Sequence, residues 1–178
     1  MTTMRMQQIT LREINTLDQD SFVTALSSLI EGPPWIVREG WHARPFESLT
    51  QLHQALCAVM YNAPLEQQMA LLQAHPDLVG RAALAGTLSP ESTGEQVSAG
   101  LDRLSQEEIA TFTRLNQAYR DHFGFPFVIC VRENKKESIL AGFNARLQNT
   151  RSQEIEIALG EVAKICWFRL QDLVREDE

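Results

Sequence analysis

The 178-residue chain lacks the features that define several large classes of protein. Its three cysteines, Cys57, Cys130 and Cys166, are odd in number and lie in apolar or helical surroundings, which favours reduced thiols over a disulfide framework. No apolar run approaches the roughly 18 residues of a membrane span, and the first residues contain no signal-peptide core. The 16 basic residues form no run longer than Lys135-Lys136 and the net charge is −7, so we expect no surface for nucleic acid or anionic lipid.

The sequence also lacks internal repeats and linker-like stretches, and its last letters, VREDE, match no endoplasmic-reticulum or peroxisomal address. The cytoplasm is the expected location. With 44% hydrophobic residues, a chain of this length should bury about 70% of its unfolded surface in a single core. We therefore expect one domain over residues 1–178, with residues 1–9 flexible and residues 175–178 forming a polar tail.

Helical patterns dominate what is present. Apolar residues recur at helical spacing, or start and stop signals occur, over 18–32, 48–62, 63–74, 105–124, 135–149 and 152–174. In the fourth segment Ser105 and Glu108 form a capping box and Gly124 ends the helix. Only FPFVICV is typical of extended backbone. Since one strand cannot make a sheet alone, the sequence predicts an all-α, single-domain helical bundle with one short buried extended segment at about 125–131.

Arg169 and Asn116 interrupt apolar helix faces. Arg169 follows Cys166 by three residues within the apolar stripe of the last helix, so its side chain is directed inward unless it extends past the helix end to solvent. An unpaired buried guanidinium is very costly, so an anionic group should meet it. That group is either an internal carboxylate or the carboxylate of a ligand. Asn116 lies on the inner face of its own helix and is interpreted as a hydrogen-bonded core amide.

His75 directly precedes Pro76 in the segment AHPDLVGR. Because a proline disfavours the α conformation in the residue before it, the preceding helix should end at Ala74 and leave His75 at its carboxyl end. The negative end of the helix dipole favours imidazolium there, which suits a proton donor. Two interpretations stay open from these residues alone: a cap for helix carbonyls, or an acid–base group.

The segment ESTGEQVSAGLDRL contains Ser92 and Glu95 at the spacing of a capping box. Helix initiation alone would account for this pair. A helix start also presents backbone N–H groups, which could bind an anionic or urea-like ligand together with Glu95 and Gln96. The spacing does not choose between the two roles.

Five motifs, in this order, carry a resemblance to a known enzyme family. They are AHPDL, ESTGEQVSAGLDRL, LNQAYRDHFGFPFVICVR, ILAGFNARLQNT and EIALGEVAKICWFRL. As an ordered set they are highly specific, and over residues 10–173 the chain resembles the 2-oxo-4-hydroxy-4-carboxy-5-ureidoimidazoline (OHCU) decarboxylases of urate degradation. The resemblance implies an all-helical, cofactor-free carboxy-lyase, usually a homodimer, that converts OHCU to (S)-allantoin and CO₂.

The resemblance also implies roles for individual residues. His75 would be the catalytic proton donor or acid–base group, Glu95 would pair with or orient it and contact the substrate, and Arg169 would hold the substrate carboxylate. The other implied substrate contacts are Pro76, Ser92, Gln96, Phe127, Val128, Ile129, Cys130 and Val131. Peptide groups would make the contacts of the extended segment, and Cys130 is expected to be a small apolar neighbour and not a nucleophile.

The chemistry of OHCU agrees with a site that needs neither pyridoxal phosphate, thiamine nor metal, because the substrate's own C=N bond can accept the electrons released with CO₂. A metal site is nevertheless a competing interpretation. His53 and Cys57 are four residues apart on one predicted helix, a spacing compatible with ligation, and His42 or His75 could join them.

A non-catalytic helical interaction module is the second competing interpretation. Trp167 and Phe168 lie off the apolar stripe of the last helix, where they could form a partner surface. The same two residues could instead be buried at a dimer contact.

Overall fold

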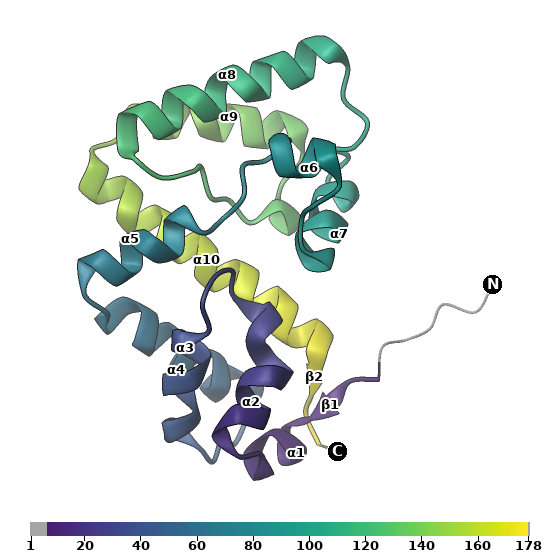
Figure 1. Cartoon of the computed structure of the whole chain (residues 1–178), viewed down its shortest axis with the longest axis vertical. Coiled ribbons are helices and arrows are strands. Elements are labelled where there is room, and N and C mark those ends of the chain that lie inside the picture. Colours follow the sequence, from purple (N-terminus) through teal and green to yellow (C-terminus); the bar gives the residue numbers. More distant parts are fainter. Residues whose placement is uncertain (1–6, 178) are drawn as a thin grey trace, which may run out of the picture. The chain divides into compact units, whose positions relative to one another are not determined.

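The computed structural model describes residues 7–177 and consists mainly of helices (Figure 1). The helices are α1 (Leu11–Thr16), α2 (Gln19–Leu26), α3 (Trp35–Gly40), α4 (Leu49–Asn62), α5 (Leu65–Gln73), α6 (Arg81–Ala85), α7 (Pro90–Ser98), α8 (Gln106–Phe123), α9 (Lys136–Arg146) and α10 (Arg151–Leu173). Single turns of 3₁₀ helix are η1 (Ser27–Leu29), η2 (Trp41–Ala43) and η3 (Val131–Glu133). Two short strands, β1 (Ile9–Thr10) and β2 (Val174–Arg175), pair in parallel. The predicted all-α class is confirmed.

The chain divides into two compact units. Unit 1 runs to Pro64 and resumes at Ala163, and unit 2 is Leu65–Val162. Helix α10 therefore contributes its first part to unit 2 and its second part to unit 1. The expectation of one domain over residues 1–178 stays a prediction. Within the described residues, no helix has the length and apolar character needed to cross a membrane.

Local sequence signals account for the ends of the longer helices. The capping box predicted for α8 is confirmed: the Ser105 hydroxyl accepts from the Glu108 N–H at 3.2 Å, and the Glu108 carboxylate accepts from the Ser105 N–H at 3.0 Å. Gly124 ends α8 with φ 83°, a left-handed conformation that favours glycine. At α4, the Ser48 hydroxyl accepts from the Gln51 N–H.

Several short elements differ from the sequence pattern. The helix predicted over 18–32 stops at Leu26 and continues as η1, with Gly32 in a positive-φ conformation beyond it. The pattern did not predict α1, α3 and α6. Each of these has only five or six residues, too few to establish a helical period in the sequence.

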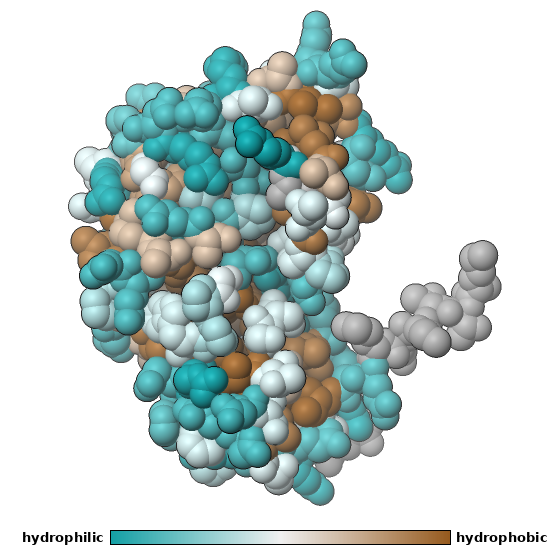
Figure 2. Space-filling view, viewed as in Figure 1, coloured by the Kyte–Doolittle hydropathy of each residue, from teal (hydrophilic) through white to brown (hydrophobic). Residues whose placement is uncertain are grey.

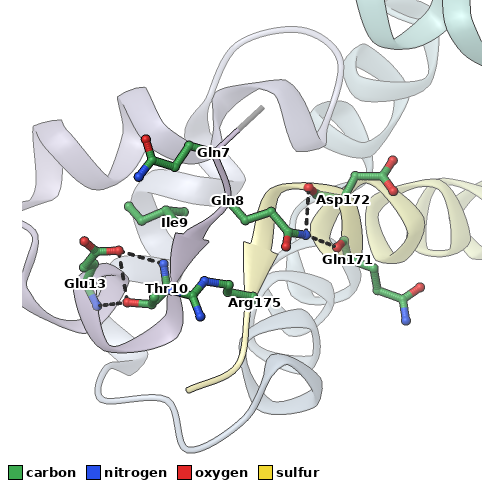
Figure 3. Close-up of a pocket in the computed structure, with 8 residues that line it drawn as sticks. All are labelled: Gln7, Gln8, Ile9, Thr10, Glu13, Gln171, Asp172 and Arg175. Atoms are coloured by element: carbon green, nitrogen blue, oxygen red, sulfur yellow. Dashed lines mark hydrogen bonds between the residues drawn. The ribbon is translucent and has the colours of Figure 1, made fainter. Parts of the chain in front are cut away.

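The start of the described chain is bound to unit 1. Gln8 Nε2 donates to the carbonyl oxygens of Gln171 and Asp172 at 3.0 and 3.1 Å (Figure 3), and Ile9 lies in β1. Residues 1–6 of the segment expected to be flexible lie outside the described residues. Side-chain hydrogen bonds connect Gln8 to α10, and strand pairing connects Ile9 to β2. The expected flexibility of these two residues stays a prediction. The polar C-terminal tail begins within β2.

The predicted buried extended segment is confirmed. Residues 125–130 are neither helical nor paired in a sheet, and all of them are buried. The Phe127 ring stacks on Phe143 with centroids 3.8 Å apart and meets Tyr119 edge-on at 5.3 Å. These aromatic contacts place the segment in the core of unit 2, against α8 and α9.

The cysteines differ in burial, which predicts an order of thiol reactivity. Cys130 and Cys166 are 1% and 2% exposed, whereas Cys57 is partly exposed. Burial raises the pKa of the Cys166 thiol to about 12, and it also raises the pKa of Cys57 and Cys130. We expect a thiol reagent to modify Cys57 first in the folded protein and all three cysteines at similar rates in denaturant. Mass mapping of timed samples measures this order, and labelling of Cys166 ahead of Cys57 would contradict it.

Candidate acid–base site

His75 lies just beyond the end of α5, as predicted, and is 7% exposed. Its Nδ1 is 3.0 Å from the Leu71 carbonyl oxygen, and its backbone N–H donates to the Leu72 carbonyl at 3.2 Å. Because a carbonyl can only accept, Nδ1 carries the proton of this hydrogen bond, and Nε2 is the ring nitrogen whose protonation can change. One nitrogen caps the helix while the other stays suited to proton transfer, so the two interpretations of His75 are compatible.

Helix α7 begins earlier than the capping-box pattern predicted. Ser89 is its N-cap, with the hydroxyl accepting from the Ser92 N–H at 3.1 Å, and Pro90 occupies the first turn. The structure therefore contradicts a helix start at Ser92, which both interpretations of the Ser92–Glu95 spacing assumed, because Ser89 followed by Pro90 is the stronger start signal. Ser92 and Glu95 lie instead one turn apart inside the helix.

The buried face of α7 is polar. Ser92, Glu95 and Gln96 follow at i, i+3 and i+4 spacing and are only 6–7% exposed, whereas Val97 is 47% exposed. A helix usually buries its apolar residues, and buried polar groups require hydrogen-bond partners. This inversion makes the inward face of α7 a candidate for ligand binding or chemistry.

One peptide group in the loop after His75 is held from both sides. The Leu78 carbonyl oxygen accepts from Asn116 Nδ2 at 2.8 Å. The Val79 N–H of the same peptide group donates to Gln96 Oε1 at 3.1 Å. Val79 has φ 52°, a left-handed conformation that costs a β-branched residue about 1–3 kcal/mol. Two carboxamides therefore attach this loop to α7 and α8.

A buried guanidinium anchors the extended segment. Arg146 Nη1 donates to the Val128 carbonyl oxygen at 2.7 Å, and the guanidinium carbon lies 4.3 Å from the centre of the Phe127 ring. The Cys130 N–H donates to the Glu161 carboxylate at 3.3 Å. From 127 to 131 no side chain is more than 8% exposed, so the groups that this segment can offer a ligand are its peptide groups.

Arg146 is in turn held by a fully buried carboxylate. Glu154 Oε1 accepts from Arg146 Nε and from the Tyr119 hydroxyl, each at 2.6 Å, and Oε2 accepts from Asn149 Nδ2 at 3.0 Å. Burial, together with the hydrogen bond to Glu154, raises the pKa of Tyr119 and keeps its phenol protonated as a donor. This network joins α8, α9 and the first part of α10 around the extended segment.

Arg169 belongs to unit 1, and its inward direction is confirmed by an exposure of 7%. Its Nη2 lies 3.3 Å from Glu31 Oε1, and Nη1 donates to the Ser28 carbonyl at 3.2 Å. The anionic group that the helical stripe predicted is therefore the carboxylate of Glu31. A contact between Arg169 and a substrate carboxylate stays a prediction.

The His53–Cys57 pair lies in unit 1. His53 Nε2 is 2.8 Å from the Ala163 carbonyl oxygen and 3.4 Å from Cys57 Sγ, and its ring packs edge-on against Trp167 at 5.2 Å. Between residues 7 and 177, no group of three or more His, Cys, Asp or Glu side chains is arranged to hold a metal ion. The observed contacts of this pair are ring packing, a hydrogen bond to a backbone carbonyl and the contact between the two side chains.

A surface pocket of about 1120 Å³ lies in unit 1 beside β1 and β2 (Figure 3). Its lining residues are Gln7, Gln8, Ile9, Thr10, Glu13, Gln171, Asp172 and Arg175. Glu13 and Thr10 bond to each other there. The pocket contains none of the predicted site residues.

Apart from Arg169, the predicted site residues all lie in unit 2. The loop after His75 is bonded to α7 through Gln96, and α7 contacts η3, which continues the extended segment. The fold defines an all-α protein, and these groups form a candidate acid–base site. The chain belongs to the OHCU decarboxylase family, whose model matches residues 15–171.

Known proteins extend this similarity over most of the chain. A protein from Haloferax volcanii named 2-oxo-4-hydroxy-4-carboxy-5-ureidoimidazoline decarboxylase is 40% identical over 167 residues, which are 94% of this chain and 97% of the relative. A relative of the same name from Amia calva is 39% identical over 165 residues, covering 93% and 94%. A crystal structure of (S)-allantoin synthase matches 94% of this chain with a TM-score of 0.76 and 28% identity, and the chain spans 54% of that protein.

The sequence patterns did not identify two features of this region: the unsatisfied oxygen of Asn116 and the buried Arg146–Glu154 pair. The expectation of a satisfied core amide holds for Nδ2 of Asn116 but not for its buried Oδ1, which has no partner among the described residues. Glu154 precedes the buried Ala158 by one helical turn, and Arg146 follows the buried Phe143 by three residues. The helical spacing that identified Arg169 could therefore have identified this buried ion pair as well.

Proposed function

We propose that this chain decarboxylates OHCU to (S)-allantoin and CO₂ in urate degradation. The observation that carries the proposal is His75, with Nδ1 bound to a helix carbonyl, at the start of a loop that is hydrogen-bonded to a helix whose buried face consists of Ser92, Glu95 and Gln96. Membership of the family and relatives named as OHCU decarboxylases support it.

The substrate carries its carboxylate on a carbon that also bears a hydroxyl and adjoins a C=N bond. As CO₂ leaves, the electrons of the broken C–C bond form a C=C bond, and the displaced C=N electrons pass to nitrogen, which takes up a proton. Loss of the hydroxyl proton then gives a carbonyl, and protonation of the neighbouring carbon creates the stereocentre. Because the substrate supplies its own electron sink, we propose that no cofactor takes part.

His75 Nε2 is assigned the proton transfer that follows loss of CO₂, at the hydroxyl or at the new C–H bond. The Leu71 carbonyl fixes the ring through Nδ1 and so sets the direction in which Nε2 points. Glu95 is proposed to orient the ring. A proton delivered from one fixed nitrogen reaches one face of a planar intermediate, which accounts for a single enantiomer.

Substrate contacts are assigned to groups whose orientation is fixed. Gln96 Oε1 is occupied by the Val79 N–H, so this carboxamide offers N–H donors to a ligand, which suits a carbonyl oxygen of the ureido group or ring. In the extended segment, protein groups bind peptide atoms of Val128 and Cys130. The opposite ends of the same two peptide groups are the Ile129 N–H and the Ile129 carbonyl oxygen, which face the other side of the extended backbone, and these are the proposed ligand contacts.

Two further residues complete the proposed set. Pro76 is proposed to line the site beside His75. Arg169 is proposed to bind the substrate carboxylate, with its guanidinium fixed by Glu31 and the Ser28 carbonyl.

A chiroptical assay tests the proposed function. OHCU is generated in situ from urate with the two preceding enzymes, and circular dichroism follows allantoin formation. We expect this protein to accelerate the appearance of dextrorotatory (S)-allantoin, because the spontaneous reaction gives a racemate without optical signal. Heat-denatured protein is the control. Optical activity that accumulates no faster than in the control would contradict the proposal.

We also propose that the protein is a cytoplasmic homodimer, as the family resemblance implies. Hydrophobic residues lie among hydrophilic ones on the face drawn in Figure 2, and Tyr61 and Leu65 are 51% and 54% exposed. Light scattering should give a mass near twice 20.1 kDa, and a monomer mass would contradict the dimer. A folded dimer that neither binds allantoin nor turns over OHCU would favour the interaction-module interpretation.

A further inference from the structure

We propose that Asn116 is a positioning residue: through the Leu78–Val79 peptide group it sets the orientation of Gln96 and the path of the loop that begins at His75. The inference rests on the proposed function, because His75 and Gln96 act in that site. Asn116 itself is given no contact with substrate.

The hydrogen bonds allow one orientation for each carboxamide. A carbonyl oxygen only accepts, so Asn116 must turn Nδ2 toward Leu78, and a peptide N–H only donates, so Gln96 must turn Oε1 toward Val79. The bonds form one polar chain, from Asn116 through the peptide group to Gln96, in which each bond polarises the next. As a result, the Gln96 amide nitrogen is directed away from the loop.

Stability alone does not account for an asparagine at this position. Asn116 is 5% exposed, and within residues 7–177 its Oδ1 accepts no hydrogen bond. Burying an oxygen without a hydrogen bond costs free energy of folding, and an apolar side chain would avoid that cost. Val79, on the same peptide group, adds a left-handed conformation that β-branched residues rarely adopt. Two unfavourable features at one peptide group, next to site residues, are typical of strain held in place for function.

The first test replaces Asn116 by leucine, which has a similar size but no donor. We expect kcat/KM for OHCU to fall about tenfold, equivalent to about 1.4 kcal/mol of transition-state stabilisation, with little change in thermal unfolding. The matched control is Asn144→Leu, because Asn144 Nδ2 also donates to a backbone carbonyl, that of Leu140, but within its own helix and on an exposed surface. The control should keep the wild-type kcat/KM. Wild-type kcat/KM in Asn116→Leu would overturn the proposal.

A double-mutant cycle separates positioning from general packing. If Asn116 acts through Gln96, then Asn116→Leu should lower kcat/KM less than about threefold in a Gln96→Met background. An equal, tenfold loss in both backgrounds overturns the proposal. A wild-type protein that does not accelerate allantoin formation contradicts the proposed function instead, so the two failures are distinguishable.

Hydrogen exchange gives a readout that is independent of turnover. Both Asn116→Leu and Gln96→Met should speed exchange of the Val79 amide, which donates to Gln96 Oε1. If Asn116→Leu folds poorly, Asn116→Ser takes its place in each measurement. Unchanged protection of the Val79 amide in the Asn116 variant overturns the proposal.

Discussion

Replacing His75 by asparagine is expected to reduce OHCU turnover about 10²–10⁴-fold while leaving the protein folded. The asparagine Nδ2 occupies nearly the place of the imidazole Nδ1, so it can still donate to the Leu71 carbonyl and cap α5. What it removes is Nε2, the nitrogen proposed to move the proton. His75→Gln makes the complementary change, placing an amide near the Nε2 position without a titratable group, and should lose as much activity.

The measurement is the initial rate of (S)-allantoin formation, with far-ultraviolet circular dichroism and thermal unfolding as folding checks. His122→Asn is the matched control, because His122 is exposed at the end of α8. It should turn over at the wild-type rate. If His75→Asn also keeps the wild-type rate, His75 is a helix cap and another group transfers the proton.

The position of His75 could be predicted from the sequence because the signal is local. A proline restricts the residue before it, and that rule alone ended α5 and placed the imidazole at its carboxyl end. The capping-box spacing, a different local signal, misleads at Ser92 and Glu95. These two residues have that spacing, although Ser89 and Pro90 provide the actual helix start. A local motif can therefore be present while a neighbouring, stronger signal determines the structure.

Partners across the chain could not be predicted in the same way. Helical periodicity gave the direction of Arg169, but Glu31 lies 138 residues earlier and no spacing rule connects the two. The same holds for Asn116 and Leu78, which are 38 residues apart. The left-handed conformation of Val79 could not be predicted from the sequence, because β-branched residues such as valine rarely adopt positive φ.

The second large effect concerns stability. Replacing Glu154 by leucine should destabilise the protein by about 3–5 kcal/mol, because it leaves the Arg146 guanidinium buried without its counter-ion. The Tyr119 hydroxyl and the Asn149 amide lose their acceptor at the same time. For a chain of this length, such a change lowers the melting temperature by roughly 10 °C.

Thermal and urea unfolding measure this loss, and Asp20→Ala is the matched control. Asp20 pairs with Arg38, but their side chains are 90% and 44% exposed, so removing this surface pair should change stability little. A Glu154→Leu variant that unfolds like the Asp20→Ala variant would contradict the importance of the buried pair.

Replacing both Arg146 and Glu154 by apolar residues should show whether the buried pair is needed for stability, for the position of the extended segment, or for both. In the double variant Arg146→Met and Glu154→Leu no charge is left buried, so we expect part of the lost stability to return, as when other buried ion pairs are replaced by apolar residues. The Val128 carbonyl, however, still loses the donor that fixes it, and Phe127 loses the guanidinium over its ring. We therefore expect the double variant to be more stable than Glu154→Leu and yet to bind allantoin more weakly than the wild type. Wild-type allantoin affinity would show that packing alone holds residues 127–131 in place.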